Sequence, residues 1–351
     1  MANRILITGA GGYIGAMLCD QFSQRADVER IIALDKAPMP EWARANPNIR
    51  WIAADTAGAS WQQIVAAERP DLVIHAAWQI RDMYGQDALQ REWNVAGSDA
   101  VIDFALSRPT VKRLAYFSTV ASYGAQSGNT IEHRFREEDE FRASDLRYAE
   151  EKRIVEAHLA EKFAIAQARG SEAAVVVLRP AAISGPRGRR RRGHVGLQSA
   201  LAGHMKGGLV HRLISLLLSV VPVTPKWCRQ FIHEDDIVDI AALTAFGDLK
   251  AAHNVFNVCP PGDVVRGADM AKAFGKRAIR VHPQLIRLAF FLVWHGSRGR
   301  IATSRGTWES YCYPVAVDGS KLTNEYGYRY RMDSLDALTR NEGRYAALTQ
   351  P

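Results

Sequence analysis

The stretch "LITGAGGYIG" (residues 6–15) decides the fold. It joins the apolar run "RILIT" (4–8) to a helical pattern and places Gly9, Gly12 and Gly15 between them. In such a turn the first glycine permits a tight bend, the second lets the backbone approach a pyrophosphate, and the third allows the helix to pack on the strand. The first N–H groups of the helix favour phosphate oxygens. The stretch predicts a dinucleotide-binding loop, with a purely structural turn as the alternative.

Short apolar runs alternate with helical patterns through the first half of the chain. Alternating strands and helices produce right-handed crossovers and a parallel sheet with helices on both faces. The predicted fold class is therefore α/β, with a doubly wound (Rossmann) parallel sheet. The expected strands are residues 4–8, 30–35, 49–55, 71–77, 112–118, 173–180 and, later in the chain, 253–260.

The pattern changes after Pro180, where glycine, proline and arginine become frequent. We expect a nucleotide-binding domain over residues 1–180, to which residues 230–260 return. Residues 181–229 and 261–351 are expected to form a smaller, discontinuous substrate-binding lobe. A ligand would then bind near the carboxyl ends of the strands.

Asp35 stands at the end of the second expected strand, 20 residues after Gly15. A carboxylate there can accept hydrogen bonds from both hydroxyls of an adenosine ribose and would repel a 2′-phosphate. The sequence thus favours NAD over NADP, although Lys36 beside it weakens the preference. Asp55 follows the third strand and is placed either to reach the adenine or to cap a helix.

The stretch "RYAEEK" (147–152) sets Tyr148 and Lys152 four residues apart, on one face of a helix. One such match can arise by chance. Its context strengthens it, because "FSTVASYG" (117–124) precedes it and "LRPAAISGP" (178–186) follows it. Both flanking stretches continue expected strands, where a doubly wound sheet presents polar groups to its ligand.

Together these motifs make the chain resemble the extended short-chain dehydrogenase/reductases of the NAD-dependent epimerase/dehydratase family. The resemblance covers nearly the whole chain and implies an NAD-dependent enzyme. The motifs that carry it are, in order, "TGxxGxxG" at Thr8 to Gly15, the acidic Asp35, "HAA" at 75–77, "NVAG" at 94–97, "STVASYG" at 118–124, "YAEEK" at 148–152, "LRPxxxxGP" at 178–186 and "RQFIHEDDI" at 229–237.

The resemblance implies a role for each matching residue. Tyr148 exchanges a proton with a substrate hydroxyl or ketone, and Lys152 binds the nicotinamide ribose and lowers the Tyr148 pKa. Thr119 hydrogen-bonds the reacting oxygen, and Asn94 supports these catalytic residues from its helix. The residues expected to bind the cofactor are Gly9, Gly12, Tyr13, Ile14, Gly15, Asp35, Asp55, Ala76, Ala77, Tyr148 and Lys152.

Arg229 resembles the arginine that clamps the diphosphate of nucleotide-sugar substrates, a role that suits a guanidinium fork. The alternative is a surface arginine flanking a strand. Thr119 and Arg187 complete the predicted substrate-binding set. The sequence predicts no metal site.

Relatives that dehydrate or decarboxylate sugars carry carboxylates at positions where this chain has Val120 and Ala121. Chemistry that needs a second proton-transfer residue there is therefore disfavoured. Two reactions stay open: 4-epimerisation of a nucleotide sugar, and net oxidation or reduction of a hydrophobic, sterol- or isoprenoid-like alcohol or ketone. A non-catalytic dinucleotide sensor is a third hypothesis, against which the intact set of Thr119, Tyr148 and Lys152 argues.

The net charge of +8 is concentrated in residues 181–230, which hold nine Lys and Arg and no Asp or Glu. This segment favours an anionic substrate such as a nucleotide diphosphate. A solvated basic loop and contact with an anionic membrane surface are the alternatives. Nucleic acid is disfavoured because no reading module accompanies "RGRRRRGH" (187–194).

Two unusually apolar runs, residues 209–221 and 282–294, are expected to pack in the core or a dimer interface. A lipid-like substrate or a membrane surface would be the other partners. The resemblance implies a homodimer through helices at 88–107 and 145–167.

The four cysteines are widely spaced, which predicts buried free thiols in a reducing compartment. The start "MANRILITGA" carries no apolar signal-peptide core, so no leader is expected. The longest notable uncharged run, residues 213–225, is too short for a spanning helix. A cytoplasmic location is expected.

Overall fold

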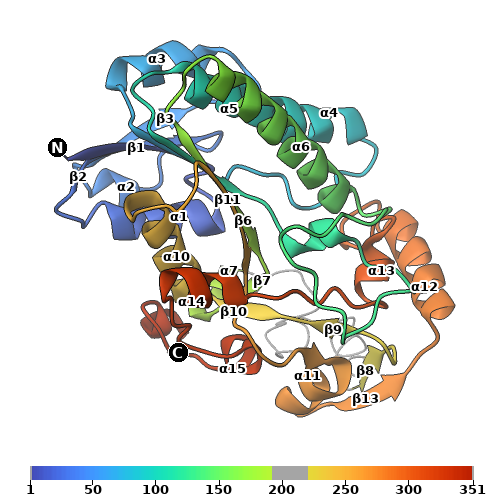
Figure 1. Ribbon diagram of the computed structural model, residues 1–351. Coiled ribbons are helices and arrows are strands. Elements are labelled where there is room, and N and C mark those ends of the chain that lie inside the picture. The colour runs from blue at the N-terminus through green and yellow to red at the C-terminus, as the bar shows by residue number, and fades with distance from the viewer. Residues whose placement is uncertain (1, 192–219, 350–351) are drawn as a thin grey trace. The chain divides into compact units, whose positions relative to one another are not determined.

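The structure is a computed structural model that describes residues 2–191 and 220–349 (Figure 1). The chain forms two compact units, each built from three segments. Unit 1 comprises Met1–Ser118, Glu151–Arg179 and Val238–Phe256, and unit 2 comprises Thr119–Glu150, Pro180–Ile237 and Asn257–Pro351. A later segment, Val238–Phe256, belongs to the first unit, and residues 119–150 group with the second. The assignment of one unit to cofactor and the other to substrate stays a prediction.

A seven-stranded parallel sheet confirms the predicted fold class. Its order is β11-β6-β5-β4-β1-β2-β3, so the chain turns back on itself between β1 and β4, the point where doubly wound folds bind ligands. Thr8 at the end of β1 pairs with His75 at the end of β4. All seven expected strands form: β1 (Asn3–Thr8), β2 (Val28–Asp35), β3 (Ile49–Ala53), β4 (Leu72–His75), β5 (Arg113–Phe117), β6 (Ala174–Pro180) and β11 (His253–Val258).

Helices cover both faces of this sheet (Figure 1). On one face, Trp61 of α3 (Ser60–Glu68), Phe104 of α5 (Gly97–Ser107) and Val155 of α6 (Arg147–Ala168) join one buried cluster with strand residues. On the other face, Phe22 of α1 (Tyr13–Phe22) meets Phe246 of α10 (Glu234–Phe246) edge to face at 5.2 Å. Shorter helices complete unit 1: α2 (Glu41–Arg44), α4 (Asp87–Arg91) and the π-helix η1 (Glu92–Ala96).

Unit 2 is built from short strand pairs and helices around its own apolar cluster, which includes Trp227, Phe231 and Met270. β10 (Phe231–His233) pairs with β7 (Ala182–Ser184), β12 (Val265–Arg266) with β9 (Cys228–Arg229), and β13 (Arg277–Arg280) with β8 (Val220–Val223). Among its described residues, the helices are η2 (Val120–Tyr123), α7 (Pro186–Arg191), α11 (Gly267–Ala273), α12 (Pro283–Gly296), α13 (Thr307–Ser310), α14 (Ser320–Tyr326), α15 (Ser334–Thr339) and η3 (Ala346–Thr349).

The two apolar runs of the sequence have different outcomes. Most of the first, together with Arg192, lies outside the described residues, and only Val220 and Val221 of it are seen, in β8. The second forms α12, in which no residue is buried. Packing of this helix in the core, one half of the expectation, is therefore wrong.

All four cysteines, Cys19, Cys228, Cys259 and Cys312, are free and buried, as predicted. Among the described residues, none of the helices combines the length and apolarity needed to cross a bilayer.

Candidate active site

The glycine-rich loop is shaped by close backbone approaches. Gly9 has a φ of +68°, and a Cβ there would lie 2.6 Å from the Cα of Ala77. A Cβ on Gly15 would collide with the carbonyl oxygen of Gly9. Gly12 immediately precedes α1, so the first N–H groups of that helix follow it. The loop therefore has the geometry of a phosphate cradle.

Asp35 at the end of β2 is oriented by the backbone around it. Its carboxylate accepts hydrogen bonds from the N–H of Gly11, at 2.8 Å, and from that of Ala37, at 2.9 Å. A carboxylate has room for further donors, so Asp35 retains capacity for ribose hydroxyls.

Lys36 is engaged by unit 1 itself. Its Nζ lies 2.8 Å from Oδ2 of Asp55 and 3.2 Å from the centre of the Trp93 ring. Asp55 also accepts the N–H of Ala57 at 2.9 Å in a local turn, and it is not the cap of α3, whose N-cap is Ala59. The positive charge of Lys36 is thus already paired with Asp55. Lys36 therefore gives no reason to expect binding of the 2′-phosphate of NADP.

These elements line one cavity in unit 1. Of the predicted cofactor residues, Gly9, Gly12, Asp35, Ala76 and Ala77 line it, with Asn94 at another wall. Tyr13 and Ile14 begin α1, and Gly15 supports the loop from within that helix. The remaining lining residues are Leu34, Lys36, Ala54, Thr56, Trp78, Gln79 and Trp93. Glycine backbone for the pyrophosphate and a ribose-facing carboxylate fit a dinucleotide.

Lys152 is buried in unit 1, with 3% of its surface exposed. Its Nζ donates a 2.5 Å hydrogen bond to the carbonyl of Phe117 and lies 3.5 Å from the centre of the Trp78 ring. Burial lowers the pKa of Lys152 well below its ordinary value, and the charges of Glu156 and Glu151 oppose that shift. The Lys152 side chain is therefore held by a carbonyl and an indole face, while the carboxylates of Glu156 and Glu151 act on it through their charge.

Asn94 joins two parts of unit 1. Its Oδ1 accepts the N–H of Gln79 at 2.7 Å, and its Nδ2 donates to the carbonyl of Gln79 at 3.0 Å and to Oε2 of Glu151 at 2.7 Å. It thus holds the loop after β4, which lines the cavity, and the residue before Lys152. These partners were not predicted from the sequence, and the role of Asn94 in supporting catalysis stays a prediction.

A second buried carboxylate lies one turn after Lys152. Glu156 forms an ion pair with Arg179 at 2.7 Å and accepts a short hydrogen bond from the hydroxyl of Ser118. Both partners of that ion pair are at least nine-tenths buried. The sequence contained one signal for the burial of Glu156. Lys152 and Glu156 are spaced i, i+4, so they lie on the same face of a helix that packs against the sheet.

In unit 2, Thr119 and Tyr148 come together. Thr119 caps η2, where its Oγ1 accepts the N–H of Ala121 at 3.2 Å, and its hydroxyl is hydrogen-bonded to Tyr148. Desolvation raises the pKa of the Tyr148 phenol, and the Thr119 hydrogen bond opposes the rise. The pKa is therefore raised here because desolvation dominates, and the lowering expected from Lys152 stays a prediction. Tyr148 and Lys152 stand four residues apart in the single helix α6.

His75 holds the end of β4 through both ring nitrogens. Nδ1 lies 2.6 Å from the hydroxyl of Thr8, and Nε2 lies 2.8 Å from that of Ser98. Burial, and to a lesser extent the charge of Lys152, lower the pKa of His75 to about 3. The ring is therefore neutral at physiological pH.

The two predicted substrate arginines have different surroundings. The Arg229 guanidinium lies 5.8 Å from the centre of the Trp227 ring and 5.5 Å from that of Tyr311. That of Arg187 lies 4.9 Å from the centre of the Tyr345 ring. Aromatic faces suit a guanidinium and leave its N–H groups available. Among the described residues, no group of three or more His, Cys, Asp and Glu could hold a metal ion.

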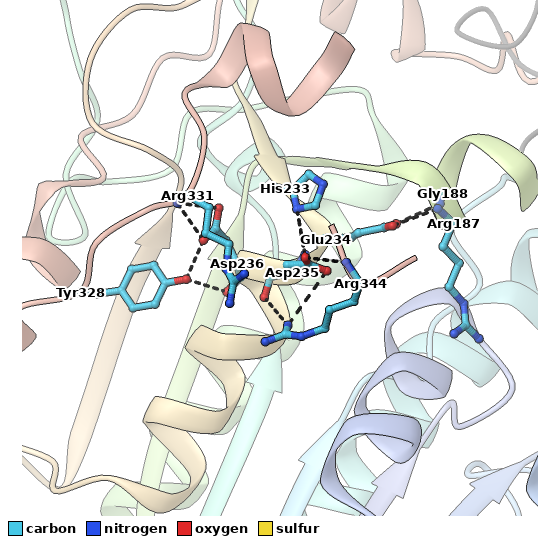
Figure 2. A network of polar contacts seen from close by, with 9 residues as sticks. All are labelled: Arg187, Gly188, His233, Glu234, Asp235, Asp236, Tyr328, Arg331 and Arg344. Carbon is cyan, nitrogen blue, oxygen red and sulfur yellow. Dashed lines mark hydrogen bonds and ion pairs between the residues drawn. The ribbon is translucent and has the colours of Figure 1, made fainter. Parts of the chain in front are cut away.

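The "HEDD" stretch at residues 233–236 is an anchor for unit 2 (Figure 2). Glu234 accepts the N–H groups of Arg187 and Gly188 at the start of α7. Asp235 accepts the N–H of Arg344 at 2.9 Å. The third acid, Asp236, accepts the Tyr328 hydroxyl at 2.7 Å and the N–H of Arg331 at 3.1 Å. Three consecutive carboxylates thus tie three distant segments of the unit together.

Comparison with known families decides the assignment. The model of the "NAD dependent epimerase/dehydratase family" matches residues 5–259. The chain belongs to this family. It is therefore an NAD-dependent enzyme of the short-chain dehydrogenase/reductase type, as the sequence predicted.

Curated relatives of this family member match over part of its length. A UDP-glucose 4-epimerase of Streptococcus mutans is 27% identical over 124 residues, 34% of this chain and 37% of that protein. An uncharacterised protein of Mycobacterium tuberculosis is 26% identical over 129 residues, 36% of this chain and 34% of that protein. The matched parts thus span about a third of the length of these relatives.

Solved structures extend the likeness of the fold over the whole chain. The enzyme WbmG of Bordetella bronchiseptica, in complex with NAD and UDP, has a TM-score of 0.68 at 22% identity and covers 97% of this chain and 93% of its own. The UDP-glucose 4-epimerase of Thermotoga maritima with UDP-glucose has a TM-score of 0.68 at 18% identity and covers 96% of each chain.

Proposed function

We propose that this enzyme is a 4-epimerase of nucleotide sugars that retains its NAD through each turnover. One observation carries the proposal. The hydroxyl of Thr119 is hydrogen-bonded to Tyr148, and the two residues that follow Thr119 are the apolar Val120 and Ala121. Such a centre holds a single proton-transfer residue, which is what epimerisation at a carbinol carbon needs.

The residues would act in sequence. Tyr148 takes the proton of the 4-hydroxyl, while Thr119 hydrogen-bonds the same oxygen and keeps it aligned. Held along Gly9, Gly12 and Asp35, NAD would supply the hydride acceptor and donor for C4, so that the ketone could be reduced again on its opposite face. Tyr148 then gives the proton back, so the substrate is isomerised with no net oxidation. Asn94 and Glu151 hold Lys152 and the loop after β4 in place throughout.

The substrate class rests on Arg229 and on the relatives. A guanidinium set between Trp227 and Tyr311 can offer a bidentate fork to a diphosphate. The S. mutans relative is named a UDP-glucose 4-epimerase, and the T. maritima structure contains UDP-glucose. Arg187 is the second arginine of unit 2 that we assign to the substrate. A homodimer and a cytoplasmic location remain predictions.

The main alternative is a dehydrogenase or reductase of a hydrophobic alcohol. It would use the same Thr119, Tyr148 and Lys152, and differs in releasing reduced or oxidised cofactor each turnover. The experiment is to incubate the purified enzyme, without added cofactor, with UDP-, GDP- and dTDP-hexoses and to separate the 4-epimers by chromatography. Conversion of one pair supports the proposal. Failure with every pair, together with stoichiometric NADH formation from a hydrophobic alcohol, would establish the alternative.

A further inference from the structure

Helix α12 presents an apolar face to solvent. Leu285, Leu288, Phe291 and Leu292 are each between 54% and 59% exposed. Single exposed apolar side chains are ordinary, but a continuous group on one helix marks an interaction site. We call these four residues the α12 face.

The opposite side of α12 is the side that packs. Phe290 meets Tyr311 edge to face at 5.3 Å, and Arg287 lies over the Trp308 ring at 5.6 Å. Both partners belong to or adjoin α13, which lies beside α12 (Figure 1). Ile286, Phe290 and Trp294 follow the i, i+4, i+8 spacing of one stripe and are only partly exposed. The helix is thus anchored by one stripe while the α12 face points away.

The chain around this helix carries one sign of charge. Residues 270–308 contain eight Lys and Arg and no Asp or Glu. Arg277 and Arg280 of β13 are exposed just before α12, and Arg298 and Arg300 are exposed just after it. The α12 face is therefore flanked in the chain, at both ends of the helix, by exposed arginines, whereas Arg305 farther on is paired with Asp145 at 3.3 Å.

We propose that the α12 face and its flanking arginines bind the surface of an anionic phospholipid bilayer. Apolar side chains on one side of a helix enter the boundary between headgroups and acyl chains, and basic residues at its ends meet lipid phosphates. The helix has 14 residues, about 21 Å, so it lies on the bilayer and does not cross it. This inference is independent of the proposed reaction.

Charge selects the bilayer over a second copy of the chain. A symmetric dimer through the α12 face would set Arg277, Arg280, Arg298 and Arg300 of one copy against the same residues of the other. Like charges brought together at an interface are unfavourable. An anionic membrane supplies the opposite charge and the apolar layer at once.

The test is co-sedimentation of the full-length protein with vesicles. One set contains phosphatidylcholine and phosphatidylglycerol in equal parts, and the other contains phosphatidylcholine alone. Binding to the anionic vesicles is expected, weakened strongly between about 50 and about 300 mM salt. Binding that is absent, or equal for both vesicle types, overturns the proposal.

Two double variants separate the apolar and charged contributions. Leu288→Gln with Phe291→Gln should weaken vesicle binding about tenfold or more, because two buried apolar side chains are lost. Arg277→Gln with Arg280→Gln should weaken it about 25-fold at low salt, since each basic residue near an anionic surface contributes about fivefold. All four positions are exposed, so the unfolding temperature of each variant should match that of the wild type.

Matched controls come from unit 1. Ile64→Gln with Ile165→Gln removes two apolar side chains that are 42% and 44% exposed, and Arg44→Gln with Lys112→Gln removes two exposed charges. Neither control should change vesicle binding, and an equal loss in a control contradicts the proposal.

Two other results would assign the α12 face to a different occupant. A wild-type dimer that dissociates in the Leu288→Gln/Phe291→Gln variant would assign the face to a second copy. A photo-crosslink from position 288 to residues 192–219, persisting with vesicles, would assign it to the same chain. Either result overturns the membrane proposal.

Discussion

Nδ2 of Asn94 donates a 2.7 Å hydrogen bond to Oε2 of Glu151, and both side chains are almost fully buried. Replacing Glu151 by Leu should lower the free energy of unfolding by about 1–3 kcal/mol, because the amide of Asn94 loses a charged acceptor away from water. Urea unfolding measures the change. Glu161→Leu, at an exposed position of the same helix, should change stability by about 0.5 kcal/mol or less. If Glu151→Leu and Glu161→Leu change the free energy of unfolding equally, Glu151 is not a buried partner of Asn94.

Asp35 should control both cofactor affinity and cofactor choice. Asp35→Ala should weaken NAD binding by about 10- to 100-fold, because a charged acceptor for ribose hydroxyls is lost. Asp35→Asn keeps an oxygen for the N–H of Gly11 and should lose less. Isothermal titration with NAD and NADP measures both affinities. An Asp35→Ala variant that binds NAD as the wild type does would remove Asp35 from the cofactor site.

Thr119 should set the pH dependence of catalysis. Its hydrogen bond opposes the desolvation that raises the pKa of Tyr148, so Thr119→Val should raise that pKa further. Because Tyr148 acts as a base in its phenolate form, kcat/KM for epimerisation should then rise only at higher pH, with about tenfold or more lost near neutrality. Thr119→Ser should restore the wild-type profile. A Val variant with an unshifted profile would refute the coupling.

His75 should make the fold sensitive to acid. Its pKa is lowered to about 3 by burial, against about 6.5 in the unfolded chain. The unfolded state therefore binds more protons between these values, and stability falls as the pH drops from about 6.5 towards 3, by up to about 4 kcal/mol. His75→Gln keeps a side chain that can hydrogen-bond and cannot titrate. Its unfolding free energy should fall less over the same range, and identical slopes would contradict this origin.

Much of unit 1 could be predicted from local patterns. All seven strands follow from short apolar runs, and the glycine loop from the spacing of Gly9, Gly12 and Gly15. These features depend on residues close together in the chain. Thr119 and Tyr148, by contrast, lie farther apart in the chain. They could be predicted to act together only because both match motifs of the family that the chain resembles.

The supporting charges could not be predicted in the same way. Glu151 and Glu156 look like the polar face of a surface helix, and their burial depends on Asn94 and Arg179, which lie 57 and 23 residues away. The exposure of α12 was also beyond the sequence, because an apolar helix usually has a neighbour in its own core. Which surface covers such a helix is decided by packing, not by its periodicity.

Deuterium transfer tests the central claim most directly. A UDP-hexose labelled with deuterium at C4 is incubated with the purified enzyme without added cofactor, and the 4-epimer is analysed by mass spectrometry. We predict that the product keeps the label at C4 in the wild type, and that Tyr148→Phe yields no product while still binding NAD. Loss of the label to solvent or to free NADH, or full activity in Tyr148→Phe, would contradict an epimerase that works through Tyr148.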